Sequence, residues 1–130
     1  MNKILESIWP SILWTAIVFI LLAMPMGNSK GTGILDLVEF DKLVHIILFA
    51  IFSFLWGNYF ANKIERKQFF VLITVVLVAS VYGLAMEFYQ KNFTQRNFSI
   101  LDAFADAIGA IIGASIAKKS PYGNRGRNQN

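Results

Sequence analysis

The chain has 130 residues, of which 55% are hydrophobic and only 15% are charged, and its formal net charge is +4. This length accommodates a single domain, and so large an apolar share excludes an ordinary soluble one. The chain contains no cysteine, which excludes a disulfide framework, a thiolate metal site and a cysteine nucleophile.

Four apolar segments of 18 residues each predict four membrane-spanning helices. They are 9–26, 43–60, 69–86 and 100–117, and only the last contains charged residues, two aspartates. A helix of a soluble core would have one polar face, whereas the third segment is apolar all round. The predicted fold is therefore all-α, a polytopic membrane protein with a four-helix transmembrane bundle in residues 1–117. The small, polar and basic tail 118–130 is predicted to be disordered.

The first segment also has features of a secretory signal peptide, because Lys3 precedes the apolar run and small residues follow it. However, Glu6 lies in the would-be basic region, the run is longer than a usual signal core, and no A-x-A cleavage site follows. We therefore expect this segment to be retained as the first helix.

The distribution of basic residues predicts the orientation of the bundle. With four spans, one side carries eight Lys and Arg residues and the other side carries four: Lys30, Lys42, Lys91 and Arg96. The positive-inside rule then places both termini in the cytoplasm. Carboxylates run the opposite way, two inside and six outside. The basic charge is thus explained by topology, and no nucleic-acid partner is predicted.

Three polar side chains, Asp41, Lys42 and His45, open the second predicted helix at its outer end. Asp41 can serve as the helix N-cap, where a negative charge is favourable. His45 is the one histidine of the chain, and we expect it to form a hydrogen bond with Asp41 or Glu87. A lone imidazole without thiols argues against zinc, so neither a metal nor another cofactor is predicted.

The third predicted helix ends in a polar face made of Gly83, Glu87, Gln90 and Thr94, which recur at helical spacing. Gly83 has no side chain directly beneath Glu87. We therefore expect a space at this position, to be filled by a partner helix or by a ligand.

The fourth predicted helix begins with a capping-box pattern, in which Ser99 is the N-cap and Asp102 the third helical residue. Asp106 follows on the same face, and Gly109 and Gly113 continue it as a close-packing G-x-x-x-G pattern. At 1.5 Å per residue Asp106 lies about 9 Å inside the start of the helix. A carboxylate at that depth must be paired, protonated or in contact with water.

These polar residues predict one cluster at the outer end of the bundle. Arg96 is expected to bridge Glu87 and Asp102, because a guanidinium can bind two carboxylates, and Lys42 or His45 is expected to join them. The candidate ligand-binding residues are Asp41, Lys42, His45, Glu87, Gln90, Arg96, Asp102 and Asp106.

The ordered set of a D-K-x-x-H opening, then E-x-x-Q, an arginine, an aspartate and G-x-x-x-G resembles the VanZ-like family over residues 9–117. One departure is Asp106, where members of that family commonly have asparagine. The resemblance implies a small multi-pass protein of the bacterial cytoplasmic membrane. The family is named for an accessory protein of glycopeptide-resistance clusters that confers low-level teicoplanin resistance, which is a phenotype and not a reaction.

An outward-facing polar cluster suits the binding of a lipid headgroup, a lipid-linked wall precursor or a lipoglycopeptide whose acyl tail lies in the outer leaflet. An intramembrane enzyme is the alternative, with Glu87 or Asp102 as general base and Arg96 holding a phosphate or oxyanion. It ranks below binding, because the chain has no H-E-x-x-H, D-x-D or nucleophile-elbow motif.

Two further readings remain open. The pair of aspartates could carry protons, as intramembrane acids often do, although four helices offer little pathway unless the chain forms a homo-oligomer. Alternatively, the cluster only holds the helices together, and the protein acts as a subunit that contacts another membrane protein.

Overall fold

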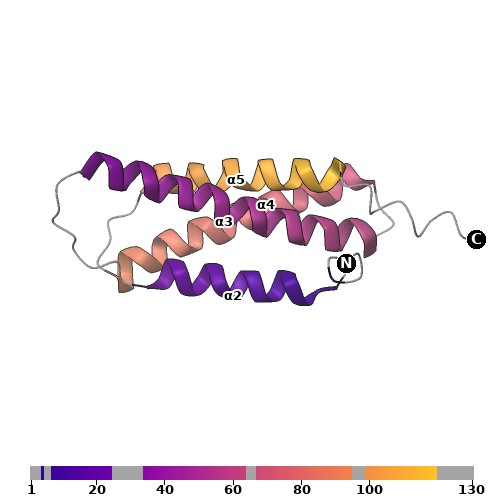
Figure 1. Ribbon diagram of the computed structural model, residues 1–130, viewed down its shortest axis with the longest axis horizontal. Helices are drawn as coiled ribbons and strands as arrows, with labels where there is room; N and C mark the ends of the chain where they lie inside the picture. Colours follow the sequence, from indigo (N-terminus) through magenta and orange to yellow (C-terminus); the bar gives the residue numbers. More distant parts are fainter. Residues whose placement is uncertain (1–3, 5–6, 25–33, 64–66, 95–98, 120–130) are drawn as a thin grey trace, which may run out of the picture.

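The computed structural model describes residues 4, 7–24, 34–63, 67–94 and 99–119. Their regular structure consists of four helices, which are α2 (Trp9–Ala23), α3 (Ile34–Lys63), α4 (Gln68–Phe93) and α5 (Ile100–Lys119). The helices lie side by side along one long axis (Figure 1). The all-α prediction is thus confirmed for the described part of the chain. The predicted tail begins at the end of α5, and residues 120–130 lie outside this part.

Three of the four helices are long and apolar enough to cross a membrane: Lys42–Lys63 within α3, Gln68–Phe93 and Ile100–Ala117. α5 therefore qualifies as a possible membrane span in spite of its two aspartates. α2 is apolar but has only 15 residues, about 22 Å at 1.5 Å per residue. It ends before residue 26, the predicted end, because Met24 is extended, with ψ of 129°, as expected of a residue that precedes a proline.

α3 begins earlier than predicted, at Ile34 instead of residue 43. The prediction that Asp41 caps this helix is therefore wrong, because Asp41 lies two turns inside it. An apolar-run criterion could not find this start, since residues 34–42 include three carboxylates and a lysine and only the segment from Lys42 has the composition of a span.

α5 packs most extensively against α3, along the predicted small-residue face. A Cβ atom added to Gly109 would collide with the carbonyl oxygen of Ile46, and one added to Gly113 would collide with that of Ala50. Only glycine permits so close an approach of two helix backbones, so the predicted packing role of both glycines is confirmed.

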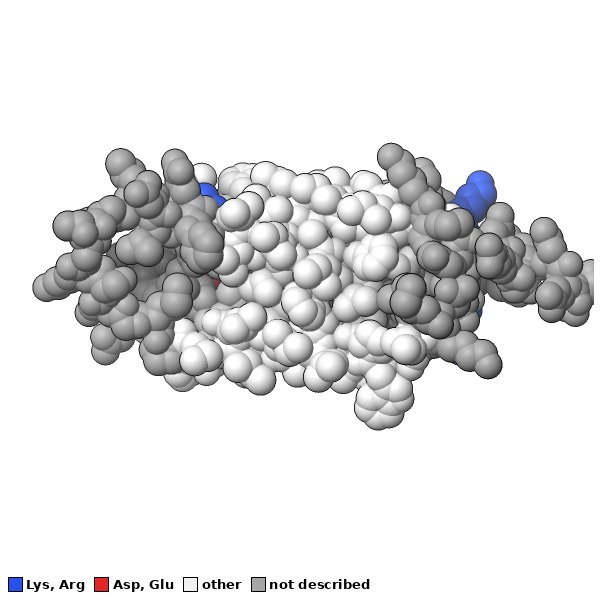
Figure 2. Space-filling view, in the orientation of Figure 1, with Lys and Arg blue, Asp and Glu red and all other residues white. Residues whose placement is uncertain are grey.

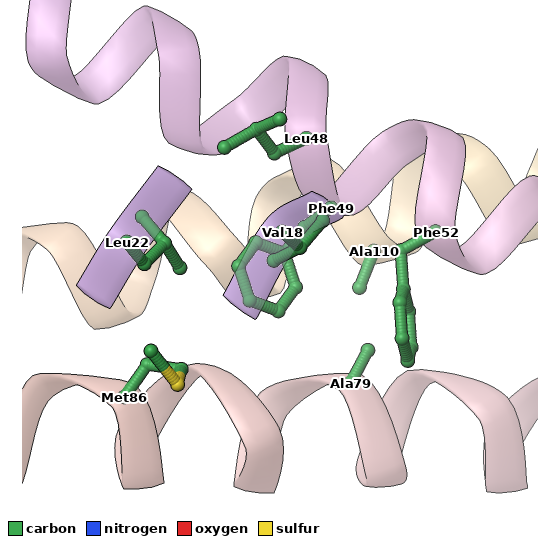
Figure 3. Packing of buried hydrophobic residues seen from close by; sticks show 8 residues of the cluster. All are labelled: Val18, Leu22, Leu48, Phe49, Phe52, Ala79, Met86 and Ala110. Carbon is green, nitrogen blue, oxygen red and sulfur yellow. The ribbon is translucent and has the colours of Figure 1, made fainter. Parts of the chain in front are cut away.

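The hydrophobic core lies where all four helices meet. Figure 3 shows side chains from α2, α3, α4 and α5 converging, and they are Val18, Leu22, Leu48, Phe49, Phe52, Ala79, Met86 and Ala110. α2 is also held by hydrogen bonds. The Nε1–H of Trp14 donates to the carbonyl oxygen of Leu48 (3.0 Å). The hydroxyl of Tyr82 donates to the carbonyl oxygen of Thr15 (3.2 Å).

The outer surface of the helices is apolar as well. Exposed side chains on α4 and α5 include Phe69, Leu77, Val81, Phe104 and Ile111. Figure 2 shows no described charged residue on the middle of the face turned toward the viewer; the coloured atoms lie toward the ends. Helices that are apolar on both their buried and exposed faces require lipid around them. The chain is therefore a multi-pass membrane protein.

Candidate functional site

A buried ion pair between α3 and α5 forms the centre of the polar cluster. His45 Nδ1 lies 2.7 Å from Asp106 Oδ1, and both side chains are only 1% exposed. The sequence did not predict this partner, and the predicted bond from His45 to Asp41 or Glu87 stays a prediction. The pairing with Asp106 follows from the glycine contact: Gly109 brings α5 against Ile46, the neighbour of His45, and Asp106 lies one turn before Gly109.

The space left by Gly83 on α4 is filled by this same aspartate. A Cβ atom on Gly83 would collide with Asp106 Oδ2 and would lie 2.9 Å from Asp106 Cβ. Of the two occupants that the sequence left open, a partner helix or a ligand, the structure shows the partner helix.

Glu87 connects α4 to the beginning of α5. Its Oε2 accepts a hydrogen bond from the backbone N–H of Ser99 (3.1 Å), one of the N–H groups that a helix N-terminus leaves without an internal partner. Ser99 Oγ accepts from the N–H of Asp102 (3.3 Å), so the predicted N-cap role of Ser99 is confirmed. The reciprocal half of the capping box is not formed by Asp102, because Glu87 occupies that N–H.

His45, Glu87 and Asp106 form a buried triad, which is the name used below. Each offers one possible ligand atom, and these atoms all lie within 4.8 Å of one another. The three residues come from three different helices, α3, α4 and α5. Glu87 is 1% exposed, and its Oε1 has no hydrogen-bond partner among the described residues. The triad can therefore bind a cation or exchange protons in an apolar setting.

The remaining predicted residues differ in their surroundings. Gln90 is buried, but its Nε2 donates to the carbonyl oxygen of Leu22 (2.8 Å), which caps the C-terminal end of α2. Asp102 is 5% exposed and lies close enough to repel Glu87 electrostatically. Lys42 is half-buried and makes no ion pair with any described residue. Arg96 and the side chain of Asp41 lie outside the described part of the chain, so the predicted Arg96 bridge stays a prediction.

An apolar groove between α2, α3 and α4 has no signal in the sequence. It has a volume of about 750 Å³ and is lined by residues that include Thr15, Phe52, Trp56, Val75 and Tyr82. Inside it the Nε1–H of Trp56 donates to Thr15 Oγ1 (3.0 Å). Neither the spacing of aromatic residues nor their number predicts such a groove, because the groove depends on how the three helices pack in space.

Comparison with protein families decides the identity at family level. The model of the VanZ/LLP1 family matches residues 5–120, nearly the whole chain. The chain belongs to the VanZ/LLP1 family. The resemblance inferred from the polar residues is thus confirmed, and within this VanZ-family protein those residues include two members of the triad, His45 and Glu87. Comparison with curated proteins and with solved structures gives no match.

Proposed function

We propose that this VanZ-family protein binds an amphiphile of the outer membrane leaflet at the triad end of the bundle, and thereby lowers susceptibility to lipoglycopeptides such as teicoplanin. The amphiphile is a lipid, a lipid-linked wall precursor or the drug itself. The observation that carries the proposal is the triad: three ionisable side chains, at most 1% exposed, within an apolar bundle. Charges at such a position are costly, and in membrane proteins they mark functional sites.

The location of the triad supports the same proposal. The ends of α2 and α4 and the beginnings of α3 and α5 gather at one end of the molecule (Figure 1), and Glu87 and Asp106 lie nearly two turns inside the ends of α4 and α5. By the positive-inside rule this is the outer side. The groove between α2, α3 and α4 extends from the middle of the bundle toward the opposite end, where Phe60 and Phe70 line it. It would accept the far end of an acyl tail, since its walls are mainly aromatic and aliphatic.

The experiment measures teicoplanin and vancomycin susceptibility in a sensitive Gram-positive host that expresses the wild type, Glu87→Gln or Ser115→Ala. Ser115 is the matched control, because it is exposed and its hydroxyl donates to the carbonyl oxygen of Ile111 in its own helix (2.7 Å). We expect the wild type and Ser115→Ala to raise the teicoplanin threshold severalfold, and Glu87→Gln to abolish the increase at equal membrane level.

An unchanged threshold in the wild type would contradict the proposal. If Glu87→Gln failed to accumulate in the membrane, the triad would instead be a structural link between helices. Membrane levels measured by blot separate these two results.

A second candidate is an intramembrane enzyme acting on a lipid-linked substrate, and the His45–Asp106 pair favours it. A carboxylate that holds one imidazole nitrogen orients the ring for general-base catalysis. Turnover of lipid-linked wall precursors by the purified protein, followed by mass spectrometry, tests it. Turnover lost in His45→Gln but kept in Ser115→Ala supports the enzyme, whereas no product with the wild type contradicts it.

A further inference from the structure

Glu87 is the carboxylate of the triad that calls for a positive partner. It is 1% exposed, and its Oε1 has no hydrogen-bond partner among the described residues. Among those residues no lysine or arginine forms an ion pair with Glu87. A negative charge buried in a membrane protein is costly, so this position favours a bound positive charge or a proton.

The donor set fits a divalent transition-metal ion. One imidazole nitrogen and two carboxylate oxygens, none more than 4.8 Å from another, are the ligand types that Zn²⁺ and Mn²⁺ accept. A doubly charged ion between two carboxylates and a neutral imidazole leaves no net charge on the three residues. In the sequence, a single histidine argued against a zinc site. In the structure, the carboxylates of Glu87 and Asp106, on two other helices, lie beside this histidine and complete a possible set of ligands.

The pair formed by His45 and Asp106 requires only a small adjustment to hold a metal ion, whereas atoms up to 4.8 Å apart must move closer together. Two ligands bound to one metal at about 2.0–2.1 Å stand about 3.3 Å apart in a tetrahedral site. His45 Nδ1 and Asp106 Oδ1 are now 2.7 Å apart, so the ion would replace the proton that they share. Glu87 can supply Oε1, which no described residue engages, while Oε2 stays on the N–H of Ser99.

We propose that His45, Glu87 and Asp106 form a binding site for one divalent transition-metal ion, Zn²⁺ or Mn²⁺. Mg²⁺ is a poor fit, because it prefers to keep several of its waters and the triad is closed to solvent. The ion holds α3, α4 and α5 together at the end of the bundle that the proposed function uses.

The test is a direct measurement of metal content and affinity on the full chain in detergent. A Strep tag replaces a polyhistidine tag, so that His45 is the one imidazole present. After chelation and gel filtration, the protein is titrated with ZnCl₂, MnCl₂ or MgCl₂ and analysed by mass spectrometry of the eluted metal. We expect about one equivalent of Zn²⁺ or Mn²⁺ per chain, a higher melting temperature with the metal, and no such effect of Mg²⁺.

Two variants separate a site from adventitious binding. Glu87→Gln keeps the shape of the side chain and removes a ligand charge, and we expect at least tenfold weaker binding. Ser115→Ala is the matched control, since Ser115 is exposed and its hydroxyl donates within its own helix, away from the triad, and we expect less than threefold weakening. X-ray absorption of the zinc form should show only nitrogen and oxygen ligands at about 2.0–2.2 Å, with the imidazole signature lost in His45→Gln.

A wild-type protein that binds no Zn²⁺ or Mn²⁺, or binds them equally well after Glu87→Gln, would overturn the inference. The triad would then be balanced by protons or by residues outside the described part. Because the metal is measured on purified protein without any drug, this result is separate from the susceptibility test: either proposal can fail while the other stands.

Discussion

At the scale of single residues, Asp106 contacts two other helices, α3 and α4. It is fully buried, it lies 2.7 Å from His45, and its carboxylate fills the space above Gly83. Each contact depends on another helix, so Asp106 connects α3, α4 and α5 at once. Removing one partner of a buried ion pair leaves the other without compensation, which typically costs about 3–5 kcal/mol.

The coupling of His45 and Asp106 can be measured with a double-mutant cycle. We expect His45→Gln and Asp106→Asn each to destabilise the folded protein, and the double variant to be more stable than the sum of the two effects predicts, by about 0.5–3 kcal/mol. The readout is thermal or denaturant unfolding in detergent, without added metal. Strictly additive effects would contradict a direct interaction between these two side chains.

At the scale of the helices, two interactions set the packing. The glycines of α5 place that helix against the carbonyl groups of α3, and Gln90 of α4 caps the end of α2 through Leu22. α2 is the shortest of the four helices, and about 22 Å is less than the hydrocarbon core of roughly 30 Å. Because α2 is shorter than the hydrocarbon core, its hydrogen bonds to α3 and α4 fix its position in the bundle.

The close approach of α3 and α5 predicts a difference between two glycine substitutions. A Cβ on Gly113 would collide with the backbone of Ala50, which cannot move aside, whereas one on Gly57 would lie 3.0 Å from the Cβ of Ala117 and 3.3 Å from the side chain of Leu72. We expect Gly113→Ala to destabilise by about 1–3 kcal/mol and Gly57→Ala by less. Unfolding in detergent and gel-filtration profiles measure both; equal effects would contradict the packing described.

At the scale of the whole molecule, the charged residues gather at the two ends of an apolar bundle. Lys63 and Lys67 lie at the end where α4 begins, and Lys91 lies at the end that contains the triad. The orientation of these ends relative to the cell decides whether the triad meets the outer leaflet. The proposal of an envelope function therefore depends on topology.

Topology can be tested without first removing native thiols, because the chain has no cysteine. We expect Lys91→Cys to react with a membrane-impermeant maleimide in intact cells, and Lys63→Cys to react only after the cells are permeabilised. Both side chains are exposed and lie at opposite ends of the bundle. The reverse pattern would place the triad on the cytoplasmic side and contradict the proposed function.

The sequence alone determined that the protein is helical and resides in a membrane. It also determined which helix faces carry polar or small residues. A membrane-spanning helix requires a minimum number of apolar residues, whatever the neighbouring helices are. The length of the apolar runs is therefore enough to predict the spans. The common face of Glu87 and Gln90 and the small-residue face of Gly109 and Gly113 also followed from helical periodicity. These features are local, so one chain segment at a time is enough to predict them.

Only the tertiary structure decided which of these faces meet. Periodicity places Asp106 on the face of α5 that carries Gly109 and Gly113, but its pairing with His45 depends on how far α5 approaches α3. Gln90 likewise contacts α2 and not a ligand, because the end of α2 reaches its level. A partner on another helix depends on distance in space, and residues 61 positions apart, such as His45 and Asp106, have no sequence signal for it.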